Sequence, residues 1–137
     1  MEMLSGGCLC GAVRFSCSEE VVLAGHCQCT DCQKVSGAGH LSNIGVPSGS
    51  VTVTGELQHH SHSADSGNTV TRGFCAKCGC DVHTKNSGMP QFEFLRAGTL
   101  DNLEWFKPTL AVFTASGASW DVLSPSLQHF EGMPDGM

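Results

Sequence analysis

The amino-acid sequence predicts a mainly β fold with one short helix. Short segments that alternate in polarity or are rich in β-branched residues recur along the chain, for example at positions 12–17 and 51–54. Turns that contain glycine or proline separate these segments. Seven of the nine cysteines fall into three close groups, at positions 8–10, 27–32 and 75–78. Such spacings are typical of small sheets held together by bound metal ions.

Length and charge narrow the class of protein. The chain has 137 residues, and about 100 to 200 residues are usual for one domain, so we expect residues 1–137 to form a single domain. Thirteen acidic and seven basic side chains give a formal charge of −6, which argues against a nucleic-acid partner. The first residues lack the pattern of a secretory signal, and no apolar run approaches membrane-spanning length. We therefore expect a cytoplasmic protein with no membrane partner.

The cysteines are best explained as metal ligands. Disulfides are rare in a reducing compartment, and nine cysteines cannot all pair within one chain. Groups of the form C-x-C and C-x-x-C that return at a distance are a specific signal for zinc. We predict a zinc-binding domain with two zinc ions per chain.

The first third of the chain carries two cysteine groups. Glycines around Cys8 and Cys10 allow a tight bend, and the alternation that follows predicts a strand over 12–17 with Val13, Phe15 and Cys17 on one face. Cys17 has no close cysteine neighbour and is expected to be a buried core residue. A short strand over 21–24 then leads toward the central group.

A short helix is predicted within the central cysteine group. Thr30 or Asp31 is a suitable N-cap, the helix extends to about Val35, and Gly37 and Gly39 end it.

Strands dominate the rest of the sequence. The patterns predict strands over 41–46, 51–54, 70–74, 92–95 and 109–113. The polar segment 58–68, which contains His59, His60 and His62, is expected to be a solvated hairpin loop. The tail has no clear period and is expected to wrap the sheet.

The cysteines divide into two sets of different character. Cys8, Cys10, Cys75 and Cys78 make a complete set of four thiolates, which is the arrangement that structural zinc prefers. Cys27, Cys29 and Cys32 supply only three ligands, and three protein ligands with an open position are typical of catalytic zinc.

Two further residues bear on the second set. Cys80 or His26 is an alternative fourth ligand that would close the three-cysteine site. If the position stays open, a small thiol is its natural occupant, because coordination deprotonates a thiol.

Several motifs together resemble one known family. They are G-C-L-C-G-A-V-R-F at 7–15, C-x-C-x-x-C with S-G-A behind it at 27–38, R-G-F-C-x-x-C-G at 72–79 and A-G-T-L-D at 97–101. This order resembles the glutathione-dependent formaldehyde-activating enzymes, which include relatives of centromere protein V. The sequence departs from the family pattern in three places: Gln28 replaces a frequent histidine, Cys80 replaces a small polar residue, and the segment after Pro108 reads Thr-Leu-Ala where a His-Ile is expected.

The resemblance implies a fold and an activity. The fold is the Mss4-like arrangement of small coiled antiparallel β-sheets with zinc knuckles. The activity is a carbon–sulfur lyase reaction that joins the aldehyde formaldehyde to glutathione as S-hydroxymethylglutathione. By position, Cys8, Cys10, Cys75 and Cys78 match the structural ligands, and Cys27, Cys29 and Cys32 match the catalytic ones.

The working hypothesis needs a proton donor and a basic patch. His26 or His40 is a candidate to protonate the alkoxide that forms on the aldehyde, because histidine titrates near neutral pH. Glutathione is anionic, so its binding calls for nearby cations. The candidates are Arg14, Lys34, Arg72, Lys77 and Lys85.

Three alternatives remain beside this hypothesis. One is a related carbon–sulfur reaction on another thiol or aldehyde. The second is a noncatalytic zinc module that binds a protein partner or buffers metal and aldehyde, which is favoured if Cys80 completes the second site. The third is a thiol redox role for the central group.

Overall fold

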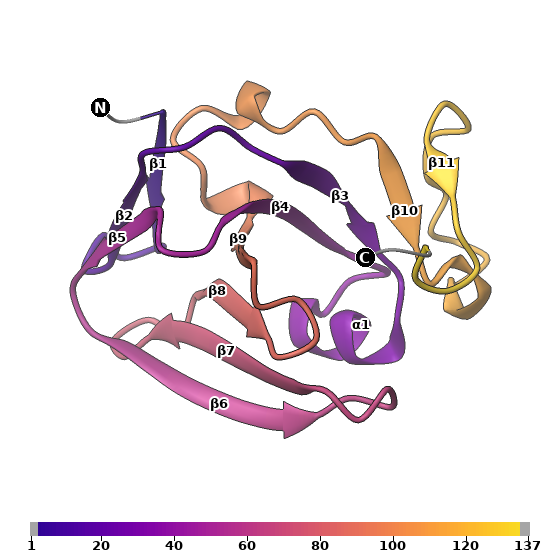
Figure 1. Cartoon of the computed structure of the whole chain (residues 1–137), viewed down its shortest axis with the longest axis horizontal. Helices are drawn as coiled ribbons and strands as arrows, with labels where there is room; N and C mark the ends of the chain where they lie inside the picture. The colour runs from indigo at the N-terminus through magenta and orange to yellow at the C-terminus, as the bar shows by residue number, and fades with distance from the viewer. Residues whose placement is uncertain (1–2, 135–137) are drawn as a thin grey trace.

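The computed structural model describes residues 3–134 and confirms the mainly β prediction. Its described residues form two β-sheets and one α-helix (Figure 1). The smaller sheet has the order β1-β2-β5 and the larger has the order β11-β10-β3-β4-β9-β8-β7-β6. The bounds of the smaller sheet's strands are β1 Leu4–Gly7, β2 Arg14–Cys17 and β5 Val51–Thr54. Those of the larger sheet are β3 Leu23–Cys27, β4 Leu41–Pro47, β6 Leu57–Ser63, β7 Thr69–Cys75, β8 Asp81–Asn86, β9 Phe92–Arg96, β10 Leu110–Val112 and β11 Gln128–His129.

Each predicted strand overlaps an observed one, although β3 begins and ends later than the predicted 21–24, and β6 was not predicted. The segment predicted as a polar loop forms strand β6 over its first part, paired with β7 from Leu57 opposite Cys75 to Ser63 opposite Thr69. Strand β6 lies at the edge of the large sheet and is largely exposed, so it carries no apolar alternation for a sequence pattern to detect. The loop prediction was therefore wrong for β6. Strands β1, β8 and β11 were not predicted either.

The end of the chain adds two parallel pairings to an otherwise antiparallel structure. Strand β10 lies parallel to β3, with Leu110 opposite Gly25, and also parallel to β11. A Cβ atom on Gly25 would lie 2.5 Å from the carbonyl oxygen of Leu110, so glycine is required for this approach. The tail, expected to wrap the sheet, contributes strand β11, which extends the large sheet beyond β10.

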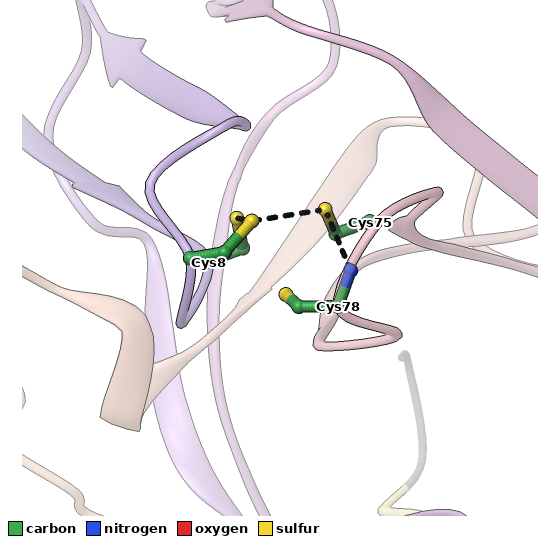
Figure 2. A group of neighbouring side chains, drawn as sticks. Cys8, Cys75 and Cys78 are labelled. Atoms are coloured by element: carbon green, nitrogen blue, oxygen red, sulfur yellow. Dashed lines mark hydrogen bonds between the residues drawn. The ribbon is translucent and has the colours of Figure 1, made fainter.

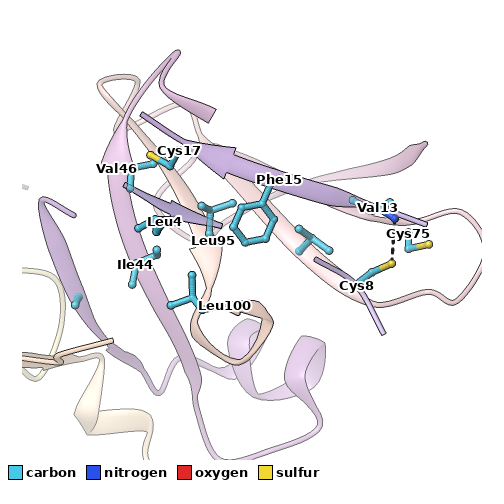
Figure 3. Packing of buried hydrophobic residues seen from close by; sticks show 12 residues of the cluster. Leu4, Cys8, Val13, Phe15, Cys17, Ile44, Val46, Cys75, Leu95 and Leu100 are labelled. Carbon is cyan, nitrogen blue, oxygen red and sulfur yellow. Dashed lines mark hydrogen bonds between the residues drawn. The ribbon is translucent and has the colours of Figure 1, made fainter. Parts of the chain in front are cut away.

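The hydrophobic core lies between the two sheets (Figure 3). Val13, Phe15 and Cys17 share one face, as the alternation predicts, and all three are buried. They belong to the same cluster as Ile44 and Leu95 of the large sheet, both of which have no exposed surface. Cys8 and Cys75 also belong to this core, so the first cysteine group lies at its edge.

The single α-helix, α1 (Thr30–Ser36), lies within the curve of the large sheet (Figure 1). Three short 3-10 helices, η1 (Ala97–Thr99), η2 (Leu103–Trp105) and η3 (Thr114–Ser116), connect the later strands. Among the residues that the structure describes, no helix is both long and apolar enough to span a bilayer.

Candidate metal centres and the adjoining cavity

The four-cysteine group assembles from two distant parts of the chain. The Sγ atoms of Cys8, Cys10, Cys75 and Cys78 all lie within 4.8 Å of one another. Figure 2 shows Cys8, Cys75 and Cys78 directing their sulfur atoms toward a common centre. The Cys8–Cys10 and Cys10–Cys75 sulfur distances are 3.7 and 3.8 Å. Four sulfurs at about 2.3 Å from one zinc ion in tetrahedral geometry would lie about 3.8 Å apart, so the group fits zinc.

Backbone geometry prepares these thiols to hold a cation. The N–H of Val13 donates to Cys8 Sγ at 3.2 Å and lowers the pKa of Cys8 to about 6. The N–H of Cys78 donates to Cys75 Sγ at 3.4 Å. Gly79 follows with a φ of 74°, a left-handed conformation that glycine adopts without strain, and it ends the turn that carries Cys75 and Cys78.

The three-cysteine group lies where strand β3 meets helix α1. Cys27 is the last residue of β3, and the Sγ atoms of Cys27, Cys29 and Cys32 lie within 4.8 Å of one another. Hydrogen bonds from Cys27 and Cys32 lower the pKa of Cys29, so one thiolate is already favoured in this group. A set of three close thiols with thiolate character also fits a zinc ion.

The N-cap of the helix lies one residue before the first of the two predicted caps. Cys29 is the N-cap, and its Sγ accepts a hydrogen bond from the N–H of Cys32 at 3.2 Å. The prediction of Thr30 or Asp31 was therefore wrong, because a thiol in the metal group takes the capping role usually filled by an oxygen. Gly37 ends the helix in the left-handed conformation, as predicted.

The two candidate fourth ligands lie outside the three-cysteine group. Among residues 3–134, no further histidine, cysteine or acidic side chain joins Cys27, Cys29 and Cys32 within 4.8 Å. Cys80 lies instead near the four-cysteine group, where burial and the charges of Cys78 and Cys8 raise its pKa. The ring of His26 is held elsewhere, with Nδ1 at 2.8 Å from Ser42 Oγ. Cys17 lies in the core and outside both groups, as expected.

A cavity of about 470 Å³ adjoins the three-cysteine group. This volume is typical of small-molecule sites, which range from about 300 to 1,000 Å³. Its wall includes Cys27, Cys29 and Cys32 together with His26. The four-cysteine group does not line it. Apolar side chains supply much of the remaining wall. They include Leu23, Leu41, Val70, Met89 and Phe94.

A polar network behind His26 was missed by the sequence reasoning. His40 Nδ1 lies 2.9 Å from Asp121 Oδ2, and the Gln28 amide donates to the same oxygen at 2.9 Å. The His40 ring contacts the His26 ring edge-on, with centroids 4.7 Å apart. Asp121 is 81 residues from His40, and no local pattern joins these positions. Only the tertiary structure reveals Asp121 as their partner.

Burial and neighbouring groups shift the pKa values of His26 and Asp121 in this network. Burial, together with the charge of His40, lowers the pKa of His26. Although burial raises the pKa of Asp121, hydrogen bonds from Gln28 and His40 bring it below its ordinary value. The network therefore favours a neutral His26 beside an ionised Asp121.

The candidate cations lie in different environments. Arg14 donates to Asp101 on the surface at 2.9 Å. Lys34, Lys77 and Lys85 are exposed. Arg72 is buried, lies on β7 and lines the cavity. Of the five, only Arg72 lies at the candidate site.

Comparison with known proteins agrees with this geometry. The family model described as glutathione-dependent formaldehyde-activating enzyme matches residues 3–116. The chain belongs to this family. Membership confirms the resemblance drawn from the cysteine motifs and supports a formaldehyde-activating role in general.

A solved structure shows the same fold as this family member. The crystal structure of a Rhodobacter sphaeroides protein aligns with a TM-score of 0.57 and 20% sequence identity. The alignment covers 72% of this chain and 88% of that one. Among curated proteins, no sequence matches this chain.

Proposed function

We propose that this protein catalyses the reversible addition of glutathione to formaldehyde, with Cys27, Cys29 and Cys32 holding a zinc ion beside the cavity. One observation carries the proposal: the incomplete, three-thiol group lies on the cavity wall, whereas the complete, four-thiol group lies away from it. A site with three protein ligands leaves room for a substrate, and a site with four does not. We therefore assign chemistry to the first group and a structural role to the second.

The reaction is a balanced addition. The sulfur of glutathione forms a bond to the carbonyl carbon, the carbon–oxygen π bond breaks, and the thiol proton ends on the new hydroxyl oxygen. The product is S-hydroxymethylglutathione, and the reverse reaction is a carbon–sulfur lyase step. Zinc bound by the three cysteines would supply a position that favours the thiolate form of the substrate.

His26 belongs to the cavity wall, but its ring points away from the cavity. It pairs with Ser42, and side chains alternate along a strand, so the ring lies on the opposite face of β3 from Gly25 and Cys27. The side chains that the ring contacts, Ser42, His40 and Phe106, do not line the cavity. We therefore assign the proton transfer to neither candidate histidine.

The test measures the exchange rate between formaldehyde, glutathione and their adduct by NMR exchange spectroscopy. The zinc-loaded wild type is expected to raise the rate above the uncatalysed background, and Cys29→Ser is expected to abolish the increase. Cys17→Ser is the matched control, because Cys17 is buried outside both cysteine groups, and it should keep the activity.

Two outcomes would contradict the proposal. If the wild type leaves the background rate unchanged, the proposed formaldehyde activity is wrong. A noncatalytic zinc-binding or aldehyde-buffering module then becomes the better explanation. If Cys29→Ser exchanges as fast as the wild type, the three-cysteine group is not the site.

A further inference from the structure

Arg72 is a buried cation without a hydrogen-bond partner at its Nε. Only 8% of the residue is exposed, and among the described residues no acceptor lies within reach of Nε. The nearby Arg96 is different: it donates to Asp81 at 2.9 Å and to Asn43 at 2.9 Å. Leaving a buried charged donor unpaired is costly. Arg72 therefore has an unused capacity to bind an anion.

The sheet directs Arg72 into the cavity. Arg72 and Val70 lie two positions apart on β7, so their side chains are on the same face of the strand. Their partners on β8 are Thr84 and Asn86, respectively. All four residues line the cavity. Among the described lining residues, Arg72 is the one arginine or lysine. An anion in the cavity would meet this guanidinium in a largely apolar wall, where a charge-assisted hydrogen bond is strong.

The other charges at the cavity limit which anion fits. Asp31 and Asp65 also line it, and both are more exposed than Arg72. They repel a carboxylate placed near them and attract an ammonium group. The wall thus suits a ligand that carries one carboxylate toward Arg72 and a positive group toward solvent.

We propose that Arg72 binds a carboxylate of the thiol substrate inside the cavity and thereby selects amino-acid-like thiols such as glutathione over neutral ones. The choice of a thiol rests on the proposed function, whereas the binding of a carboxylate rests on Arg72 itself. A competing explanation is that Arg72 only balances the negative charge of the three thiolates, since its positive charge interacts electrostatically with Cys32.

Binding of S-methylglutathione separates the two explanations. This probe keeps both carboxylates of glutathione but has no thiol to place on a metal. Its affinity for the zinc-loaded protein would be measured by isothermal titration calorimetry and compared with the affinity of its diethyl ester. The matched control is Lys85→Gln, which removes one positive charge from an exposed position on the adjacent strand β8.

We expect Arg72→Gln to weaken binding of S-methylglutathione by about 10-fold or more, because a charge-assisted bond is lost. Binding of the diester should change by less than about twofold, and Lys85→Gln should change neither by more than that. Arg72→Lys should retain part of the preference for the acid. Zinc content per chain, measured in parallel, should stay that of the wild type.

Several results would overturn the proposal. They are absence of S-methylglutathione binding to the wild type at about 10 mM, equal losses for acid and diester in Arg72→Gln, or loss of zinc with unchanged affinity for the probe. If Arg72→Gln does not fold, Arg72→Lys decides: an unchanged preference for the acid over the diester contradicts the proposal. If binding depends on Arg72 but the protein does not accelerate formaldehyde exchange, the result supports the carboxylate site and contradicts the proposed function.

Discussion

At the scale of single residues, the environment gives one residue type different roles. Cys29 is both a member of a metal-binding group and the N-cap of a helix. Cys17 is a core residue whose Sγ lies 3.3 Å from Ser50 Oγ. Cys80 lies beside a complete group without belonging to it. Position within the fold decides these roles, because a thiol is at once a ligand, a weak hydrogen-bond partner and a small hydrophobe.

Histidines are equally dependent on their environment, and His83 makes stability depend on pH. Its Nε2 lies 2.8 Å from Glu93 Oε1 in the buried part of the large sheet. Burial lowers the pKa of His83, although Glu93 opposes this effect. The folded protein therefore binds a proton at His83 less readily than the unfolded chain, whose histidine pKa is about 6.5.

We expect His83 to reduce the free energy of unfolding in acid. The unfolded state binds the extra proton, so stability is full above about pH 6.5 and falls as the pH drops below it. Urea unfolding at about pH 7.5 and about pH 5.5 would measure the loss. His83→Gln, whose amide can still donate to Glu93, should lose less stability over this interval. An equal loss in the variant would show that other groups cause it.

At the scale of elements, the ends of helix α1 are set by two different residues. Its seven residues are too few for a stable helix in isolation, so tertiary contacts and caps must hold it. The Cys29 thiol caps the start, and Gly37 ends the helix with a φ of 68°. The helix carries Cys32, so its stability bears directly on the three-cysteine group.

Replacing the helix-ending glycine should destabilise the protein by a small, defined amount. A Cβ atom on Gly37 would meet nothing within 4 Å, so the cost of Gly37→Ala comes from the left-handed backbone alone. That cost is about 1 kcal/mol. Gly98→Ala is the control, because Gly98 also has open space around its Cβ position but does not have this φ. Urea unfolding should show a loss for Gly37→Ala and almost none for Gly98→Ala; equal effects would contradict the explanation.

At the scale of the whole molecule, the four-cysteine group connects the two sheets. Cys10 follows strand β1 of the small sheet, and Cys75 ends strand β7 of the large sheet, 65 residues later. Both Cys8 and Cys75 also belong to the core between the sheets. A zinc ion at this position would stabilise the folded state directly, because the unfolded chain does not present the four thiols together.

Loss of one ligand should therefore reduce zinc content and stability together. Cys75→Ser is expected to lower bound zinc by about one ion per chain and to lower the free energy of unfolding by several kcal/mol. Elemental analysis and urea unfolding would measure the two quantities. Cys17→Ser is the control: it disturbs the core but should keep both ions. Normal stability with one zinc ion missing would contradict the structural role.

The sequence by itself determined the fold class, the family and the two cysteine sets. Local sequence patterns predict these features. The patterns are ligands two or three positions apart, alternation along a strand, and a glycine after a helix. Strand β6 escaped detection because an exposed edge strand has no buried face to impose alternation. The capping role of Cys29 escaped because thiols rarely replace oxygen caps.

Only the tertiary structure decided which cysteine group lies on a cavity and which residues surround it. Asp121 reaches His40 across 81 positions, and Arg72 becomes a buried, unpaired cation through the pairing of β7 with β6 and β8. Contacts of this kind join single residues that are far apart in the chain. They leave no periodic trace in the sequence, because sheet pairing and burial, and not local spacing, bring them together.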